Sequence, residues 1–71
     1  MLSYKKLWKI LIDRGMNKGD LRKLVGMSSG SLAKLGKNEP VSMDIVLRIC
    51  QKLHCDVGDI MEITENTEKR L

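Results

Sequence analysis

The chain has 71 residues, a net charge of +4, one Trp, one Tyr and no Phe. A chain of this length forms one domain with one modest core, because it buries only about 60% of the surface that its unfolded form exposes. This size argues against an elaborate enzyme pocket and favours a compact binding module. The core must be aliphatic, and the absence of a long alternating run of Val, Ile and Thr favours an all-α fold.

The charge is distributed unevenly along the chain. Residues 1–37 contain nine Lys and Arg against two acidic residues, whereas residues 38–71 contain four basic against seven acidic ones. Such asymmetry indicates a basic face that meets a polyanion, and the alternative is a solvated surface of uneven charge. No signal peptide or apolar run of roughly 20 residues is present, so no membrane partner is expected. The two cysteines are too close in sequence to join distant segments. Their spacing and the lack of a signal peptide predict a cytoplasmic location.

Two helices are predicted in the first 25 residues. The first covers residues 3–14, with Ser3 as its N-cap, Gly15 as its stop and an apolar stripe of helical spacing that two isoleucines widen: Tyr4, Leu7, Trp8, Leu11, Ile10 and Ile12. The second covers residues 17–25, is capped by Asn17 and ends at Gly26, which can take a positive φ. Its expected inner face consists of Leu21, Leu24 and Val25.

Three further helices follow. The third starts at its N-cap Ser28, directs Leu32 and Leu35 inward and ends between Gly36 and Asn38. The fourth covers residues 42–53, with Ser42 as its N-cap and a broad apolar stripe that predicts a central position: Met43, Val46, Ile49, Cys50 and Leu53. A short fifth helix begins at Asp56, with Asp59 completing a capping box, and its inward candidates are Val57, Ile60 and Met61. We therefore expect a five-helix domain over residues 1–63 and a polar, flexible tail over residues 64–71.

The segment from Lys18 to Leu35 has the pattern of a helix-turn-helix. Its expected inward positions lie on one face of each helix, and Gly26 permits the sharp corner between them: Leu21, Val25, Met27, Leu32 and Leu35. From about Leu7 to Met61 the chain resembles the Cro and phage-repressor (XRE-like) class of helix-turn-helix regulators. The resemblance rests on residues 17–26, 28–35 and 47–60, and it implies a lambda-repressor-like fold whose recognition helix, residues 28–36, enters the major groove.

The resemblance also implies roles for individual residues. Ser29, Gly30 and Lys34 would read base edges, whereas Lys18 and Ser28 would contact phosphate. Lys37 and Asn38 lie in the loop that meets the sugar-phosphate chain in this family. The expected DNA-binding set is therefore Asn17, Lys18, Ser28, Ser29, Gly30, Ser31, Lys34, Lys37 and Asn38. The chain departs from the family pattern at three positions. Arg22 stands where the family often has a small residue that lets the two helices approach closely, Gly30 offers no side chain for base contact, and Gly36 replaces a common acidic residue.

Other chemistry has little support in the sequence. Cys50, His54 and Cys55 are the only Cys and His residues, too few for a tetrahedral zinc site within one chain, and we expect two buried free thiols and a helix-end His54. No nucleophile stands beside a base and no phosphate-binding glycine loop is present, so neither catalysis nor a cofactor or small-molecule ligand is predicted.

The sequence thus predicts a DNA-binding transcriptional regulator, repressor-like, whose partner is double-stranded DNA. We expect a homodimer that places two recognition helices roughly 34 Å apart, with a dimer surface near Ile60, Met61 and Ile63. The alternative is a protein-interaction module, such as an antitoxin-like partner, for which DNA binding is secondary; the bare Gly30 favours that alternative.

Overall fold

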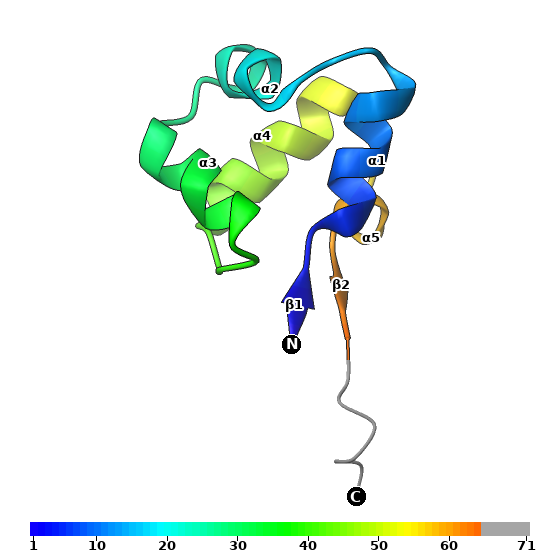
Figure 1. Ribbon diagram of the computed structural model, residues 1–71, viewed down its shortest axis with the longest axis vertical. Helices are drawn as coiled ribbons and strands as arrows, with labels where there is room; N and C mark the ends of the chain where they lie inside the picture. The colour runs from blue at the N-terminus through cyan, green and yellow to red at the C-terminus, as the bar shows by residue number, and fades with distance from the viewer. Residues whose placement is uncertain (65–71) are drawn as a thin grey trace, which may run out of the picture.

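A computed structural model of the chain describes residues 1–64. Five helices and two short strands follow one another in the order β1 (Leu2–Ser3), α1 (Lys5–Asp13), α2 (Lys18–Val25), α3 (Ser29–Gly36), α4 (Met43–Leu53), α5 (Val57–Ile60) and β2 (Glu62–Ile63). The predicted five helices are confirmed (Figure 1). Residues 65–71, which make up most of the predicted tail, lie outside the described residues.

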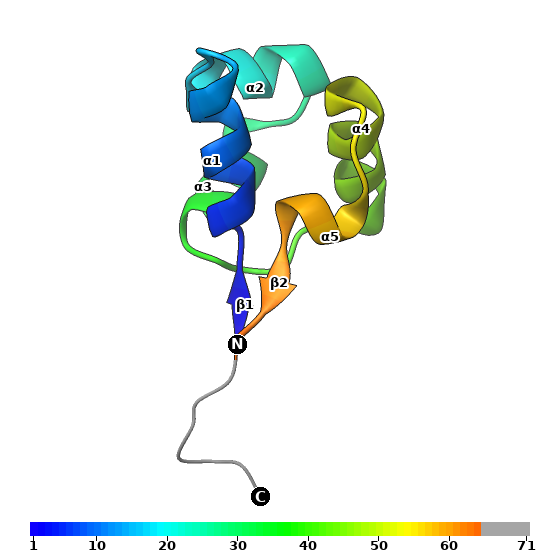
Figure 2. The ribbon, with the colours of Figure 1, turned by 90° about the vertical axis from the view of Figure 1, so that its right-hand side faces the viewer.

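The expected all-α fold needs one correction, because β1 and β2 form a small antiparallel sheet. Leu2 lies opposite Ile63 and Ser3 opposite Glu62, so the sheet joins the first residues of the chain to the last of the described ones (Figure 2). The amino group of Met1 extends the pairing by donating to the carbonyl oxygen of Thr64 at 2.7 Å. Strands of two residues are too short to produce a period-two pattern, which is why the sequence did not reveal them.

The sheet also corrects the start of the first helix. Ser3 was expected as the N-cap, but its backbone is extended in β1, and α1 begins at Lys5. Tyr4 takes the N-cap position without a side-chain capping hydrogen bond. At the other end, Gly15 follows the helix with a φ of +67°, in agreement with the expected stop.

Side-chain caps start the other four helices, as the sequence predicts. In each case the side chain accepts a hydrogen bond from a backbone N–H in the first turn of its helix: Asn17, Ser28, Ser42 and Asp56. Asn17 with Asp20 and Asp56 with Asp59 form reciprocal capping boxes. Because these bonds are local, they define where each helix begins independently of tertiary packing.

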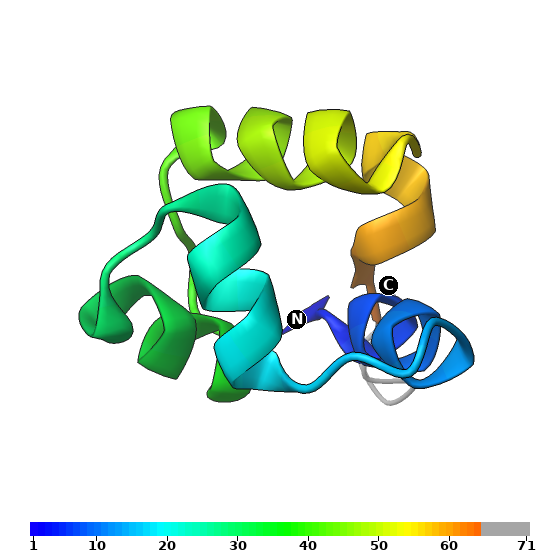
Figure 3. The ribbon, with the colours of Figure 1, turned by 90° about the horizontal axis from the view of Figure 1, so that it is seen from above.

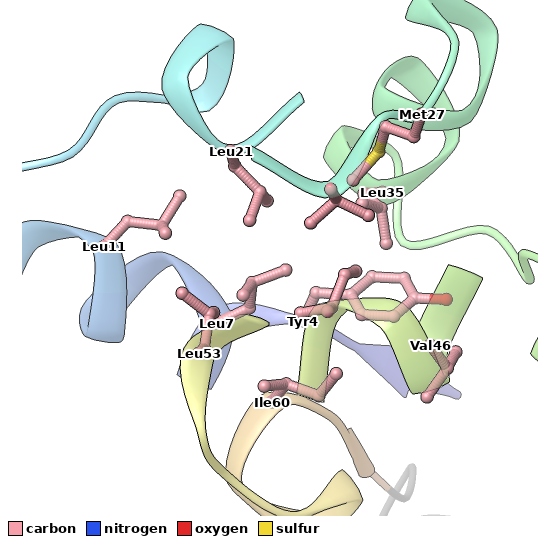
Figure 4. Packing of buried hydrophobic residues seen from close by; sticks show 11 residues of the cluster. Tyr4, Leu7, Leu11, Leu21, Met27, Leu35, Val46, Leu53 and Ile60 are labelled. Atoms are coloured by element: carbon pink, nitrogen blue, oxygen red, sulfur yellow. The ribbon is translucent and has the colours of Figure 1, made fainter. Parts of the chain in front are cut away.

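One apolar core holds the helices together. α1 and α4 lie on opposite sides of the molecule, and α5 contacts both of them. α2 contacts α4 and α3, and α3 lies at one edge (Figure 3). The core contains residues from every helix and from the turn between α2 and α3 (Figure 4): Tyr4, Leu7, Leu11, Leu21, Val25, Met27, Leu35, Val46, Ile49, Leu53 and Ile60. α4 contributes three of them and contacts both α2 and α5, as expected for a central helix.

Several residues expected to face inward do not. Ile12, Leu24 and Met43 are 76%, 40% and 60% exposed, because each lies at the margin of an apolar arc that neighbours cover on one side only. Cys50 and Cys55 are half-buried rather than fully buried. Conversely, Ile60 was expected to contribute to a dimer surface, but it is fully buried in the core and cannot contact a partner.

Candidate nucleic-acid interface

The turn between α2 and α3 is built on Gly26 and Met27. Gly26 has a φ of +77°, and the backbone N–H groups of both residues donate to the carbonyl oxygen of Arg22, at 2.9 and 3.2 Å. The side chain of Met27 is buried in the core, and the guanidinium of Arg48 in α4 donates to the Gly26 carbonyl at 3.5 Å. The corner is therefore fixed from both sides.

The inward positions of the helix-turn-helix agree with the prediction. Leu21 and Val25 of α2 and Leu35 of α3 are buried, and Leu32 is half-buried against the same core. This packing holds α3 at the edge of the molecule (Figure 1), with its polar side facing away from the core. A helix braced in this way can enter the major groove of B-form DNA, which is wide enough for one α-helix.

The outer side of α3 carries most of the predicted site. Its residues are exposed from the N-cap to the C-cap, except Ser31, which is half-buried: Ser28, Ser29, Gly30, Ser31, Lys34 and Lys37. Within this set, Ser28 accepts a hydrogen bond from the Ser31 N–H at 3.1 Å and donates its hydroxyl to Ser31 Oγ at 3.2 Å. Ser28 is thus an N-cap, as predicted, and its oxygen lies beside free N–H groups of the first turn, which attract anions.

Lys18 joins the far end of this surface. Its Nζ atom lies over the ring of Trp8 in α1, 4.5 Å from the ring centroid. A methyl group placed on Gly36 would lie 3.9 Å from the same atom, so the start of α2 lies beside the last turn of α3. The structure therefore places the Lys18 ammonium beside Gly36, the residue that precedes Lys37.

Asn38 differs from the other predicted residues because its side chain forms a hydrogen bond to another part of the fold. Its Oδ1 atom accepts a hydrogen bond from the backbone N–H of Tyr4 at 3.1 Å, and its backbone has a φ of +58°. Asn tolerates this left-handed conformation better than most residues. A DNA contact by Asn38 remains a prediction.

The positive charge of this surface is not neutralised within residues 1–64. The ion pairs of this part of the chain join Lys6 to Glu62 and Arg48 to Asp44, both away from the outer side of α3. Lys18, Lys34 and Lys37 are exposed and form no ion pair with these residues. They are therefore available to a polyanion such as the DNA backbone.

The two cysteines provide no second site among the described residues. No group of three or more His, Cys, Asp and Glu side chains is placed to hold a metal ion in residues 1–64. Burial is the main reason that the pKa of both thiols is raised, and the carboxylate of Asp59 adds to the effect. His54 ends α4, where its backbone N–H donates to the Cys50 carbonyl.

Within residues 1–64, no helix has the length and apolar character needed to cross a bilayer.

The fold and the exposed basic helix define a helix-turn-helix protein, and comparison with known proteins identifies its family. Residues 6–66 match the sequence model of the Cro/C1-type HTH DNA-binding domain. The chain belongs to this family, as the sequence resemblance predicted, and it carries a domain that binds double-stranded DNA. Among solved structures, it is similar to the crystal structure of the transcriptional regulator VanUg in its Form II. The identity is 61% and the TM-score 0.84, over 86% of this chain and 81% of that chain. A comparison with curated proteins finds no match.

Sequence reasoning missed two residues of this region. Trp8 was assigned to the apolar stripe of the first helix, but it also faces Lys18. Arg48 was not singled out, although it contacts the turn between α2 and α3. Both contacts join segments that are distant in the sequence, and no local pattern in the sequence signals them.

Proposed function

We propose that the protein is a sequence-specific transcriptional regulator that binds DNA with α3 in the major groove. The observation that carries the proposal is the placement of Ser29, Gly30 and Lys34 on the outer side of a braced, exposed helix with no acidic residue in it. The similarity to the transcriptional regulator VanUg supports the regulatory role. Such a protein would act in the cytoplasm, on double-stranded DNA.

Each residue of the surface has a proposed role. Lys34 donates to a base edge, because an ammonium group matches the O6 and N7 acceptors of guanine. Ser29 and Ser31 supply hydroxyls, and the bare Gly30 lets the backbone of α3 approach the groove closely. Phosphates on the two sides are held by the ends of α2 and α3, through Asn17, Lys18, Ser28, Lys37 and Asn38.

We further propose that the protein binds as a homodimer and represses transcription by occupying its site. A single α3 offers few base contacts, and two copies on a near-palindromic site double them. With Ile60 buried in the core, the proposed contact is centred on Ile63, which is 74% exposed in β2, and on the half-buried Met61. The mass of the protein in solution, alone and with a duplex, tests this state directly.

The function is tested by selecting duplexes from a random pool and titrating the best one with salt. We expect log K to fall linearly with log salt, and random DNA to compete far less well than the selected duplex. Lys34→Ala should weaken binding to the selected duplex by about 1–3 kcal/mol and random DNA much less. Lys52→Ala is the matched control, because it removes the same charge from the end of α4.

Two results would contradict the proposal. If no duplex is bound at low salt, DNA binding is not the function, and a protein-interaction module becomes the better description. If Lys34→Ala weakens the selected and the random duplex equally, Lys34 contacts phosphate and the base-reading role is wrong.

A further inference from the structure

We infer that Trp8 is a positioning residue for DNA binding: its ring holds the Lys18 ammonium at the end of α3, where the ammonium binds a DNA phosphate. The inference rests on the proposed function. It extends the interface to α1, which lies outside the helix-turn-helix and provides none of the predicted DNA contacts.

The first support is the geometry of the pair. Lys18 Nζ lies 4.5 Å from the centroid of the Trp8 ring, within the range of about 6 Å in which an aromatic face attracts a cation. Trp8 is half-buried and packs against the core, so its ring is held by its place in α1. The connection to α2 is also fixed, since the Met16 N–H donates to the Leu11 carbonyl at 2.9 Å.

The second support is the place to which the ring brings the ammonium. A methyl group on Gly36 would lie at ordinary contact distance, 3.9 Å, from Lys18 Nζ. The charge therefore lies at the C-terminal end of α3, where the carbonyl end of a helix attracts cations. Lys37, the C-cap of α3, follows Gly36 directly in the sequence, so a second positive residue belongs to the same end of the recognition helix.

The third support is that the ammonium keeps its capacity to bind an anion. An aromatic ring interacts with one side of the group, whereas Lys has three N–H donors. Gly36 has no side chain with which to neutralise Lys18, and no carboxylate within residues 1–64 forms an ion pair with it. An open cavity of about 260 Å³, lined by Trp8, Met16 and Lys18 among others, keeps this side of the pair accessible.

Positioning matters because a free lysine loses side-chain entropy when it binds. The long lysine side chain has many rotamers, and a contact that orders it beforehand lowers the entropy lost on binding. Removal of the ring should therefore weaken DNA binding although the charge of the protein is unchanged. If the role of Trp8 were purely structural, removal of its ring would weaken DNA binding equally with and without Lys18.

A double-mutant cycle on the selected duplex tests the inference, with Trp8→Leu, Lys18→Gln and the double variant. Lys18→Gln should lower the slope of log K against log salt by about 0.9, the contribution of one phosphate. Trp8→Leu should lower the affinity and the salt slope by less than Lys18→Gln does. The double variant should bind no more weakly than Lys18→Gln. Trp8→Phe keeps an aromatic ring and should restore most of the loss.

Two controls separate positioning from loss of folding. Ile10→Ala removes another half-buried residue of α1 and should lower the unfolding midpoint without changing the salt slope. Trp8 is the only tryptophan of the chain, so its fluorescence reports the pair directly. Lys18→Gln should change the emission of the folded, DNA-free protein, and DNA binding should change the wild-type emission but not that of Lys18→Gln.

The outcomes distinguish this inference from the proposed function. If the wild type binds no duplex, both are wrong. If it binds, but Trp8→Leu has wild-type affinity or its loss adds fully to that of Lys18→Gln, the positioning role is wrong and the regulator function stands. An unchanged salt slope in Lys18→Gln likewise removes Lys18 from the phosphate contacts and overturns the inference.

Discussion

The hydroxyl of Tyr4 donates a hydrogen bond of 2.9 Å to the backbone carbonyl of Glu39. Tyr4 is the N-cap of α1, and Glu39 lies in the loop after α3, so the bond joins the start of the first helix to the segment that follows the recognition helix. The backbone N–H of Tyr4 donates to Asn38 in the same loop. The loop that would follow the DNA backbone is thus held by a buried residue near the N-terminus.

Two variants of Asn38 separate its hydrogen bond from its backbone conformation. Asn38→Gly loses the acceptor for the Tyr4 N–H but tolerates a φ of +58°, so we expect a loss of about 0.5–1.5 kcal/mol in the free energy of unfolding. Asn38→Ala should lose about 1–2 kcal/mol more, because alanine is strained in the left-handed region. Urea denaturation measures both. If folded Asn38→Gly binds the selected duplex as well as the wild type does, the predicted DNA contact by Asn38 is wrong.

Ser28 and Ser42 provide a matched pair of N-caps, one on the proposed interface and one away from it. Each accepts a hydrogen bond from the backbone N–H three residues later, at 3.1 and 3.3 Å. Replacement by alanine should cost about 1 kcal/mol of stability in both cases. Only Ser28→Ala should also weaken DNA binding, as measured by fluorescence anisotropy below the unfolding transition. Equal DNA affinities of the two variants would show that Ser28 is a cap and nothing more.

Gly26 has a conformational role that substitution can isolate. Its φ is +77° and an added methyl group would meet no atom within 4 Å, so Gly26→Ala tests backbone strain without a clash. We expect a loss of about 1–2 kcal/mol in stability. Gly58→Ala is the control, because Gly58 also has open space but no positive φ and lies within α5. It should be neutral or slightly stabilising, and similar losses in both variants would argue against strain at Gly26.

The two thiols and Tyr4 predict how stability depends on pH. Burial raises the pKa of Cys50 and Cys55 above the ordinary 9.0, so the folded state disfavours the thiolates. Their contribution is fully present below pH 9.0 and is lost as the pH rises through the folded-state values. Burial also raises the pKa of the Tyr4 hydroxyl above its ordinary 10.0. Its contribution to stability is therefore also lost as the pH rises, but at a higher pH than that of the thiols. Thermal unfolding of a Cys50→Ala/Cys55→Ala variant should show a smaller decline above pH 9.0; parallel declines would contradict this.

The sequence predicted what short-range chemistry determines. A cap depends mainly on its own helix, and the structure confirms the predicted caps Asn17, Ser28, Ser42 and Asp56. The prediction of Ser3 as a cap was wrong, because Ser3 pairs in β1 with a strand distant in the sequence. The inward positions of the helix-turn-helix were also predictable, since they repeat with the helical period. The placement of α3 followed from the glycine turn and the family resemblance.

Contacts between distant segments were not predictable in the same way. The pairing of Leu2 with Ile63, the bond from Tyr4 to Glu39 and the stacking of Lys18 on Trp8 all depend on how complete elements pack. A periodic pattern also overestimates burial at its margins, as Ile12 shows. In a domain with so small a core, a helix is covered over a narrower arc than its apolar residues occupy.

The pairing of β1 with β2 has a consequence for engineering the domain. Met1 and Thr64 touch through hydrogen bonds, and β1 and β2 lie on the side of the molecule away from α2 (Figure 1). A linker of a few residues can therefore connect them with little loop-closure entropy. The domain is thus a candidate for circular permutation, with new ends opened near Pro40, in the loop between α3 and α4, while the core and both caps of the recognition helix stay intact.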